Sequence, residues 1–325
     1  MFYYFIFFYK FLSWHISNTH YIFVMIKFTF LYSVVLMLVA LGGMFSERSG
    51  IINIALEGIM VIGGLAGVLA AKFLAFSPAV NIILSILIAG GAGLIYALLL
   101  GFASINLKAD QTIGGTALNI LATAIAMVIA KRVAGGNSAQ LDFSNLPYLF
   151  SIGGLELSVF LPVGIILLLA AYFILYKTRL GLRLRSCGEH PQAADSVGIN
   201  VYRMRYTGVM FSGFLGGIGG MAYIVPAISK WNFEQGVTGM GFLALAVMIF
   251  GQWKPFRIAL AAVFFSLFRA MANIADSFPL LQDLHWPKEI YNMMPFIASM
   301  VVLALTSKKS RAPKAEGIPY DKGMR

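Results

Sequence analysis

Three polar side chains lie inside long apolar stretches of this 325-residue sequence: Asn53, Glu57 and Asn119. Asparagine can donate and accept hydrogen bonds, and a carboxylate can accept them from a sugar hydroxyl or from the N–H of a nucleobase. Asn53 and Glu57 are four residues apart, a spacing that predicts one face of a helix. Because polar side chains are costly in hydrocarbon, we predict that these three line a path for a polar solute. The alternative is hydrogen bonding between helices, and the sequence leaves both interpretations open.

Covalent catalysis and metal binding have little support in the sequence. The chain has one cysteine and four histidines, and no histidine lies within a long apolar stretch. The sequence also contains no G-x-x-x-x-G-K-[ST] motif for binding the phosphates of ATP. We therefore predict no catalytic residue, no metal site and no cofactor in this chain. Any ATP and Mg²⁺ would be bound by a partner ATPase.

The elements that must position the polar side chains are membrane helices. Apolar residues make up 59% of the chain, charged residues 11%, and the mean hydropathy is +0.83, whereas soluble domains carry about 25% charged residues. A helix needs roughly 20 apolar residues to cross a bilayer. The stretches that come close to this length are 28–46, 51–71, 73–105, 111–130, 157–176, 206–229, 235–253, 258–275 and 290–307. The predicted fold is an all-α bundle of about nine to ten membrane segments, some of them short or broken.

Small residues recur every four positions in two of these stretches. Gly93, Ala97 and Gly101 share one helical face, as do Gly213 and Gly217. This spacing lets helix backbones approach closely, so it favours tight packing between helices. The alternative is that the second glycine cluster forms a flexible segment near a transport path.

Basic residues are concentrated in loop 177–205 and in the tail 308–325. The chain has 24 Lys and Arg against 13 Asp and Glu, and positive loops next to membrane helices remain in the cytoplasm. We therefore predict that this loop and the C-terminus are both cytoplasmic. The net positive charge is therefore explained by basic segments beside membrane lipid, and we predict no nucleic-acid partner. Lys131 and Arg132 then fall on the outer side, against the rule.

Three regions are predicted along the chain. Residues 1–24 form an apolar segment that lies at the membrane interface or spans half of it. Residues 25–307 form the transmembrane domain, including the cytoplasmic loop 177–205. Residues 308–325 form a basic cytoplasmic tail.

The cytoplasmic loop contains a short predicted helix. Pro191 can begin it and Gly198 can end it, and its first turn reads Gln192-Ala193-Ala194. A short helix with an alanine face is suited to insertion into a groove on another protein.

With this helix, the loop resembles the Glu-Ala-Ala…Gly coupling element of permeases from bacterial ABC importers, with Gln192 at the position of the glutamate. The resemblance is to the branch of permeases shared by branched-chain amino acid, ribose-type sugar and nucleoside importers. Residues 42–58 (GGMFSERSGIINIALEG), 239–255 (GMGFLALAVMIFGQWKP) and 312–320 are most similar to the nucleoside permeases. The resemblance covers roughly residues 30–325.

The resemblance implies a permease of the bacterial cytoplasmic (inner) membrane that pairs with a second permease subunit, identical or different. It also implies a cytoplasmic ABC ATPase and an external binding protein, often a lipoprotein, that delivers a purine or pyrimidine nucleoside. The residues that the resemblance places against the ATPase are Gly188, Glu189, Gln192, Ala193, Ala194 and Gly198. Asn53, Glu57 and Asn119 fall on motif positions of the branch and are expected to line the translocation path.

Other functions remain as alternatives. Within the permease family the cargo could be a ribose-type sugar instead of a nucleoside. A carrier driven by an ion gradient would use Glu57 as its coupling carboxylate, although no inverted repeat is evident. An enzyme within the membrane would need a paired nucleophile and base or a set of metal ligands, and the apolar stretches contain neither.

Overall fold

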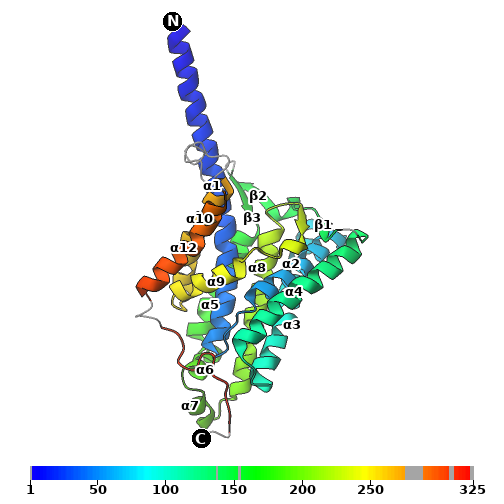
Figure 1. Ribbon diagram of the computed structural model, residues 1–325, viewed down its shortest axis with the longest axis vertical. Coiled ribbons are helices and arrows are strands. Elements are labelled where there is room, and N and C mark those ends of the chain that lie inside the picture. The colour runs from blue at the N-terminus through cyan, green and yellow to red at the C-terminus, as the bar shows by residue number, and fades with distance from the viewer. Residues whose placement is uncertain (1, 137, 153–154, 275–287, 307–310, 323–325) are drawn as a thin grey trace.

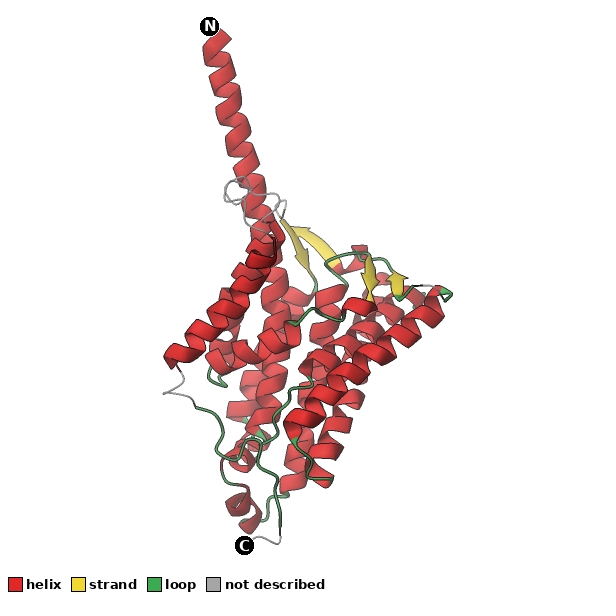
Figure 2. Cartoon of the chain, in the orientation of Figure 1, coloured by secondary structure: helices red, strands yellow, loops and turns green. Residues whose placement is uncertain are grey.

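The computed structural model describes residues 2–136, 138–152, 155–274, 288–306 and 311–322, and these form an almost entirely helical bundle (Figures 1 and 2). Within them, seven helices are long and apolar enough to cross a membrane. They are α1 (Phe2–Arg48), α2 (Leu56–Phe73), α3 (Pro78–Gly101), α4 (Gln111–Ala134), α5 (Phe160–Lys177), α8 (Val201–Ile224) and α10 (Pro255–Ile274). The predicted all-α membrane bundle is confirmed.

The two ends of the bundle differ. One end carries two antiparallel strand pairs, β1 with β4 and β2 with β3, and we call it the strand end (Figure 2). The strands are β1 (Gln140–Asp142), β2 (Leu149–Ile152), β3 (Leu155–Ser158) and β4 (Lys230–Asn232). The opposite end, which we call the loop end, carries α6 (Arg179–Glu189), α7 (Pro191–Ser196) and the C-terminus (Figure 1).

Helix α8 forms the centre of the bundle because its glycines let neighbouring backbones come close. Of the 18 consecutive residues that make up its most apolar part, 78% are buried, against 22% for the corresponding part of α5. A Cβ atom on Gly220 would lie 1.9 Å from the carbonyl oxygen of Met60 in α2, and one on Gly217 would lie 2.3 Å from that of Ala89 in α3. The prediction that small residues mediate close helix packing is therefore confirmed at α8.

The expected span of residues 235–253 is broken instead of forming one helix. A 3₁₀ turn (Phe233–Gln235) is bonded to the strand end, where Phe233 N–H donates to Ala139 O at 3.1 Å. Residues 236–239 follow without helical structure, and α9 (Met240–Phe250) has 11 residues, a length of about 16 Å. The chain then reaches the loop end, where the carbonyl oxygen of Trp253 accepts from Arg48 Nη2 at 3.2 Å. This region crosses the bundle as a 3₁₀ turn, a non-helical segment and the short helix α9, in place of one spanning helix.

The first and last described segments of the chain lie at opposite ends of the bundle (Figure 1). The backbone of residues 2–24 continues directly into the first membrane helix, because α1 is one helix that projects beyond the strand end (Figure 1). An interfacial or half-spanning role for this segment stays a prediction. Helix α12 (Lys288–Thr306) lies against α10. The described tail residues 311–322 lie on the loop end, with Ala315 and Tyr320 buried.

Candidate functional site

The polar side chains predicted for a pathway meet at a break between α1 and α2. Gly50 turns the chain with a φ of +98°, and residues 51–55 are not helical before α2 begins at Leu56. Asn53 therefore precedes the helix that contains Glu57. The prediction that these two residues share one helix face is wrong, because the helix begins three residues after Asn53.

Side chains from two other helices hold the non-helical segment 51–55 in place. Gln111 Oε1, at the start of α4, accepts from Ile52 N–H at 2.7 Å. Asn53 Nδ2 donates to Ser212 Oγ in α8 at 2.7 Å. These bonds satisfy polar groups that would otherwise be unpaired within the bundle.

Asn119 in α4 connects both sides of the break. Its Nδ2 donates to Ile54 O at 2.9 Å, and its Oδ1 accepts from Gly58 N–H at 2.7 Å. The side chain is buried, with a residue exposure of 9%. Asn119 thus bonds the backbone just before and just inside the first turn of α2, which makes it a structural clamp in this conformation.

Glu57 connects the start of α2 to the start of α9. Its carboxylate accepts from Gly239 N–H at 2.7 Å and from Gly241 N–H at 2.6 Å. The first N–H groups of a helix have no partner within the helix and carry a partial positive charge. Glu57 is therefore an N-terminal cap for α9 supplied by another helix. A Cβ atom on Gly241 would lie 2.4 Å from the Glu57 backbone nitrogen, so the two helix starts need a glycine to meet.

Two buried amide atoms at the break are not used by these contacts. Asn53 Oδ1 and Gln111 Nε2 have no hydrogen-bond partner among the described residues. Asn53 Oδ1 is an acceptor and Gln111 Nε2 is a donor, a combination that suits a polar solute. They are the unsatisfied groups of the candidate site.

The loop before α9 adds an exposed threonine that sequence reasoning missed. Thr238 is exposed and has a φ of +52°, between Gly236 at +58° and Gly239 at +79°. Its Oγ1 lies 2.8 Å from Tyr223 Oη in α8 and 3.4 Å from Arg269 Nη2 in α10. A non-glycine residue in this conformation is uncommon and is often found at functional sites. No pattern in the sequence marks it, since the strain depends on where α9 begins.

At the loop end, the predicted coupling residues fall into three groups, one buried, one exposed and one packed against the end of α1. Ala194 is buried against Cys187, Val201 and Tyr320 of its own chain, and burial raises the pKa of the Cys187 thiol. Ala194 therefore packs inward, and the alanine face that we expected to meet a partner is only partly available.

The exposed group consists of Gln192, Ala193 and Gly198, together with Val197, whose exposure is 74%. Gly198 has a φ of +84° and no atom within 4 Å of a Cβ placed on it, so it ends α7 at an open tip. We call Gln192, Ala193, Val197 and Gly198 the α7 tip.

Gly188 and Glu189 anchor α6 to the end of α1. A Cβ on Gly188 would lie 2.3 Å from Arg48 O. Glu189 Oε1 forms an ion pair with Arg48 Nη1 at 3.6 Å. These two predicted coupling residues join the loop to the bundle and do not belong to the tip.

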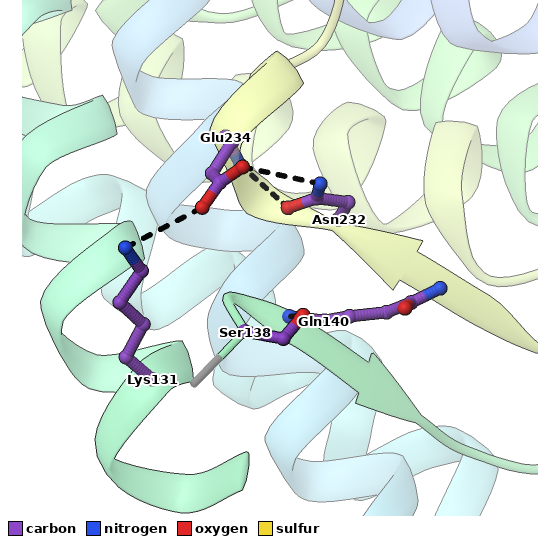
Figure 3. Close-up of polar contacts among 5 residues, drawn as sticks. All are labelled: Lys131, Ser138, Gln140, Asn232 and Glu234. Atoms are coloured by element: carbon purple, nitrogen blue, oxygen red, sulfur yellow. Dashed lines mark hydrogen bonds and ion pairs between the residues drawn. The ribbon is translucent and has the colours of Figure 1, made fainter. Parts of the chain in front are cut away.

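The strand end carries a polar cluster around the segment that leads to α9. Lys131 in α4 pairs with Glu234 at 3.4 Å (Figure 3). The N–H of Glu234 donates to Asn232 Oδ1 at 3.0 Å, and the N–H of Gln140 donates to Ser138 Oγ at 3.1 Å. Lys131, an exception to the expected distribution of basic residues, thus has a partner that ties α4 to this segment.

Among the residues that the structure describes, no three His, Cys, Asp or Glu side chains come together as a metal site. The candidate site instead joins two broken helix starts through amides, a carboxylate and backbone N–H groups. Such an arrangement can bind and release a polar solute, as discontinuous helices do in transporters.

Comparison with known proteins gives one family and several relatives. The family described as "Branched-chain amino acid transport system / permease component" matches residues 25–305. The guanosine ABC transporter permease protein NupQ of Bacillus subtilis is 39% identical over 93% of this chain and 98% of the relative. The nucleoside ABC transporter permease protein NupC of Lactococcus lactis is 38% identical over 90% and 95%. A putative glucose ABC transporter permease protein of Haloferax volcanii is 28% identical over 83% and 87%. No solved structure matches the chain.

Proposed function

The chain belongs to the family of permease components of branched-chain amino acid transport systems, and we propose that it is the membrane-spanning subunit of an ABC importer for nucleosides. The observation that carries this proposal is the similarity, over nine-tenths of the chain or more, to two permeases named for guanosine and nucleosides. As a permease component the chain is a multi-pass membrane protein and a transport subunit, and it is not an enzyme. The energy for import comes from an ATPase on a separate chain.

We propose that the cargo passes by the break between α1 and α2. The free atoms Asn53 Oδ1 and Gln111 Nε2 supply an acceptor and a donor for a base or ribose. Thr238, an exposed residue, adds a hydroxyl from the loop before α9. In this proposal Glu57 and Asn119 act by holding the backbone that forms the path, since their carboxylate and amide already bond main-chain groups.

Import requires two conformations with different affinities for the cargo, because a site that binds equally in both states transports nothing. We propose that the α7 tip docks on a cytoplasmic ABC ATPase, whose closure shifts the bundle between these states. The tip is exposed and has an apolar side chain, Val197, at its end. We propose that the loop end and the C-terminus lie in the cytoplasm, in agreement with the basic residues of loop 177–205.

The proposal includes two further partners. A second permease subunit completes the path, and an external binding lipoprotein delivers the nucleoside at the strand end. Strands β2 and β3, residues 146–148 before them and the β1–β4 pair supply the surface there, with Leu146 and Ile152 among its exposed apolar side chains.

A sugar cargo is the second candidate, supported by the 28% identity to a putative glucose permease. A carrier coupled to an ion gradient has less support. Its coupling carboxylate would be Glu57, and both Glu57 oxygens already accept backbone N–H groups at the start of α9.

The proposal is tested by purifying the tagged chain from its native membrane in mild detergent and identifying co-purifying proteins by mass spectrometry. We expect an ABC ATPase and a second permease. The isolated complex, reconstituted in liposomes with its binding protein, should import labelled guanosine or uridine when ATP is supplied on the ATPase side. If the complex imports ribose and no nucleoside, the cargo is a sugar instead of a nucleoside. A chain that is purified alone and takes up solute in response to an ion gradient would contradict the importer.

A further inference from the structure

The C-terminal segment 312–321 lies across the loop end and is bonded to several elements that are far apart in the sequence. Ala315 N–H donates to Gly188 O of α6 at 2.8 Å, and Gly317 N–H donates to Gly50 O at 3.2 Å. Within three residues, the segment therefore contacts both the helix next to the α7 tip and the turn that begins the break.

The same segment also binds α8 and the loop before α4. Arg205 Nη2 in α8 donates to Ile318 O at 3.0 Å. The ring of Tyr320 is buried and packs edge-on against that of Tyr202, with 5.6 Å between centroids. Lys108 forms an ion pair with Asp321 at 2.6 Å. Each contact is modest alone, but together they fix the whole length of the segment.

Two residues of the segment, Gly317 and Glu316, make close contacts with the end of α1 and the break after it. Gly317 has a φ of +74°, and a Cβ on it would lie 2.7 Å from Ile52 Cδ1, so only glycine suits this turn over the break. The carboxyl group of Glu316 is in hydrogen-bond contact with that of Glu47, which also accepts from Trp253 Nε1 at 2.5 Å. Burial raises the pKa of the Glu316 carboxyl.

We propose that residues 312–321 form a coupling strap, which transmits the displacement of α6 and α7 to the turn at Gly50 and hence to residues 51–55. The strap is bonded to Gly188 on one side and to Gly50 on the other, and Asn53 lies three residues beyond Gly50. A rigid, multiply bonded segment between two elements makes them move together. The proposal rests on the proposed importer, because a strap has movement to transmit only where an ATPase drives the path.

The first test measures ATP hydrolysed per nucleoside imported by the reconstituted complex. Tyr320→Ala and Glu316→Ala should each raise this ratio several-fold, because the ATPase still closes but the path responds less. Glu316→Gln should keep the normal ratio, since its amide N–H can donate to the Glu47 carboxyl group. Ile318→Ala is the matched control: its side chain is 56% exposed, and its hydrogen bonds are made by the backbone, with N–H donating to Ala315 O at 3.3 Å and O accepting from Arg205. An unchanged ratio in both alanine variants would overturn the strap. A wild-type complex that imports no nucleoside would overturn the importer itself.

A second measurement keeps the proposal testable if those variants do not assemble. Spin labels are attached at the exposed positions 314, 182 and 140 of the full-length chain in its complex, with Cys187 replaced by alanine. Distances are measured with and without a non-hydrolysable ATP analogue. The strap predicts that the distance from 314 to 182 in α6 stays constant while the distance from 182 to 140 changes. A 314–182 distance that changes as much as the 182–140 distance would overturn it.

Discussion

The start of α2 and the tip of α7 are both interruptions in the helical chain, but they are stabilised in different ways. At the start of α2, side chains from α4 bond the backbone, and Ser212 of α8 accepts a hydrogen bond from the Asn53 side chain. At the α7 tip, the residues are exposed, and an added Cβ on Gly198 would have no atom within 4 Å. The first region is therefore part of what keeps the bundle folded, and the second contributes little to folding.

This difference separates two kinds of functional residue. A substitution at the break changes stability and transport together, because the same bonds serve both. A substitution at the tip changes only the contact with a partner. The two regions can therefore be distinguished by measuring folded-state stability and nucleoside uptake on the same variants.

The largest loss of stability is expected for Asn119→Leu. The leucine leaves Gly58 N–H and Ile54 O without their partners in a buried position, at a cost of about 1–3 kcal/mol for each group. We expect a marked fall in the melting temperature of the purified chain, with a proportionate loss of assembled complex and of uptake.

Thr116→Val is the control for Asn119→Leu on the same helix. The Thr116 side chain is exposed and its hydroxyl donates only to Thr112 O of its own helix, so stability should be unchanged. If Asn119→Leu assembled normally and lost only uptake, Asn119 would be a contact for the solute and the comparison above would fail.

A smaller loss is expected for Glu57→Gln. The amide oxygen can still accept one of the two N–H groups at the start of α9, but the second bond and the negative charge at this helix N-terminus are lost. We expect about 1–2 kcal/mol less stability, partial uptake, and a larger defect in Glu57→Ala. Thermal unfolding and nucleoside uptake measured in parallel check this. Complete loss of uptake in a fully stable Glu57→Gln would instead favour a carrier with a coupling carboxylate.

Much of the fold follows from hydrophobic length and small-residue spacing. The helices α2, α4, α5 and α10 correspond to continuous apolar stretches, and the close packing of α8 follows from Gly213 and Gly217. The break over 235–253 does not follow, because that stretch is as apolar as a spanning helix. Its interruption depends on Glu57 capping α9 from another part of the chain.

The candidate site was only partly predictable for the same reason. Sequence identified Asn53, Glu57 and Asn119 as unusual, but whether such side chains face a solute or a backbone depends on contacts between distant helices. Ser212 and Gln111 were missed because their roles exist only where α8 and α4 meet the segment 51–55. The inward position of Ala194 likewise depends on Tyr320, which comes from the far end of the sequence.

The smallest effect on stability is expected for Ala193→Arg. Measuring it beside Ala194→Arg is the sharpest test of the difference between the two regions. Ala193 is exposed, so the arginine should change stability by less than about 0.5 kcal/mol, yet its bulk and charge at the α7 tip should abolish ATP-driven uptake by blocking the ATPase. Ala194 is 3% exposed and packs against Cys187, Val201 and Tyr320, so the same substitution one residue later should disrupt the loop end and lower the melting temperature. Normal uptake and ATPase co-purification in Ala193→Arg would show that the tip does not dock, whereas equal loss of stability in both variants would show that the tip is part of the fold.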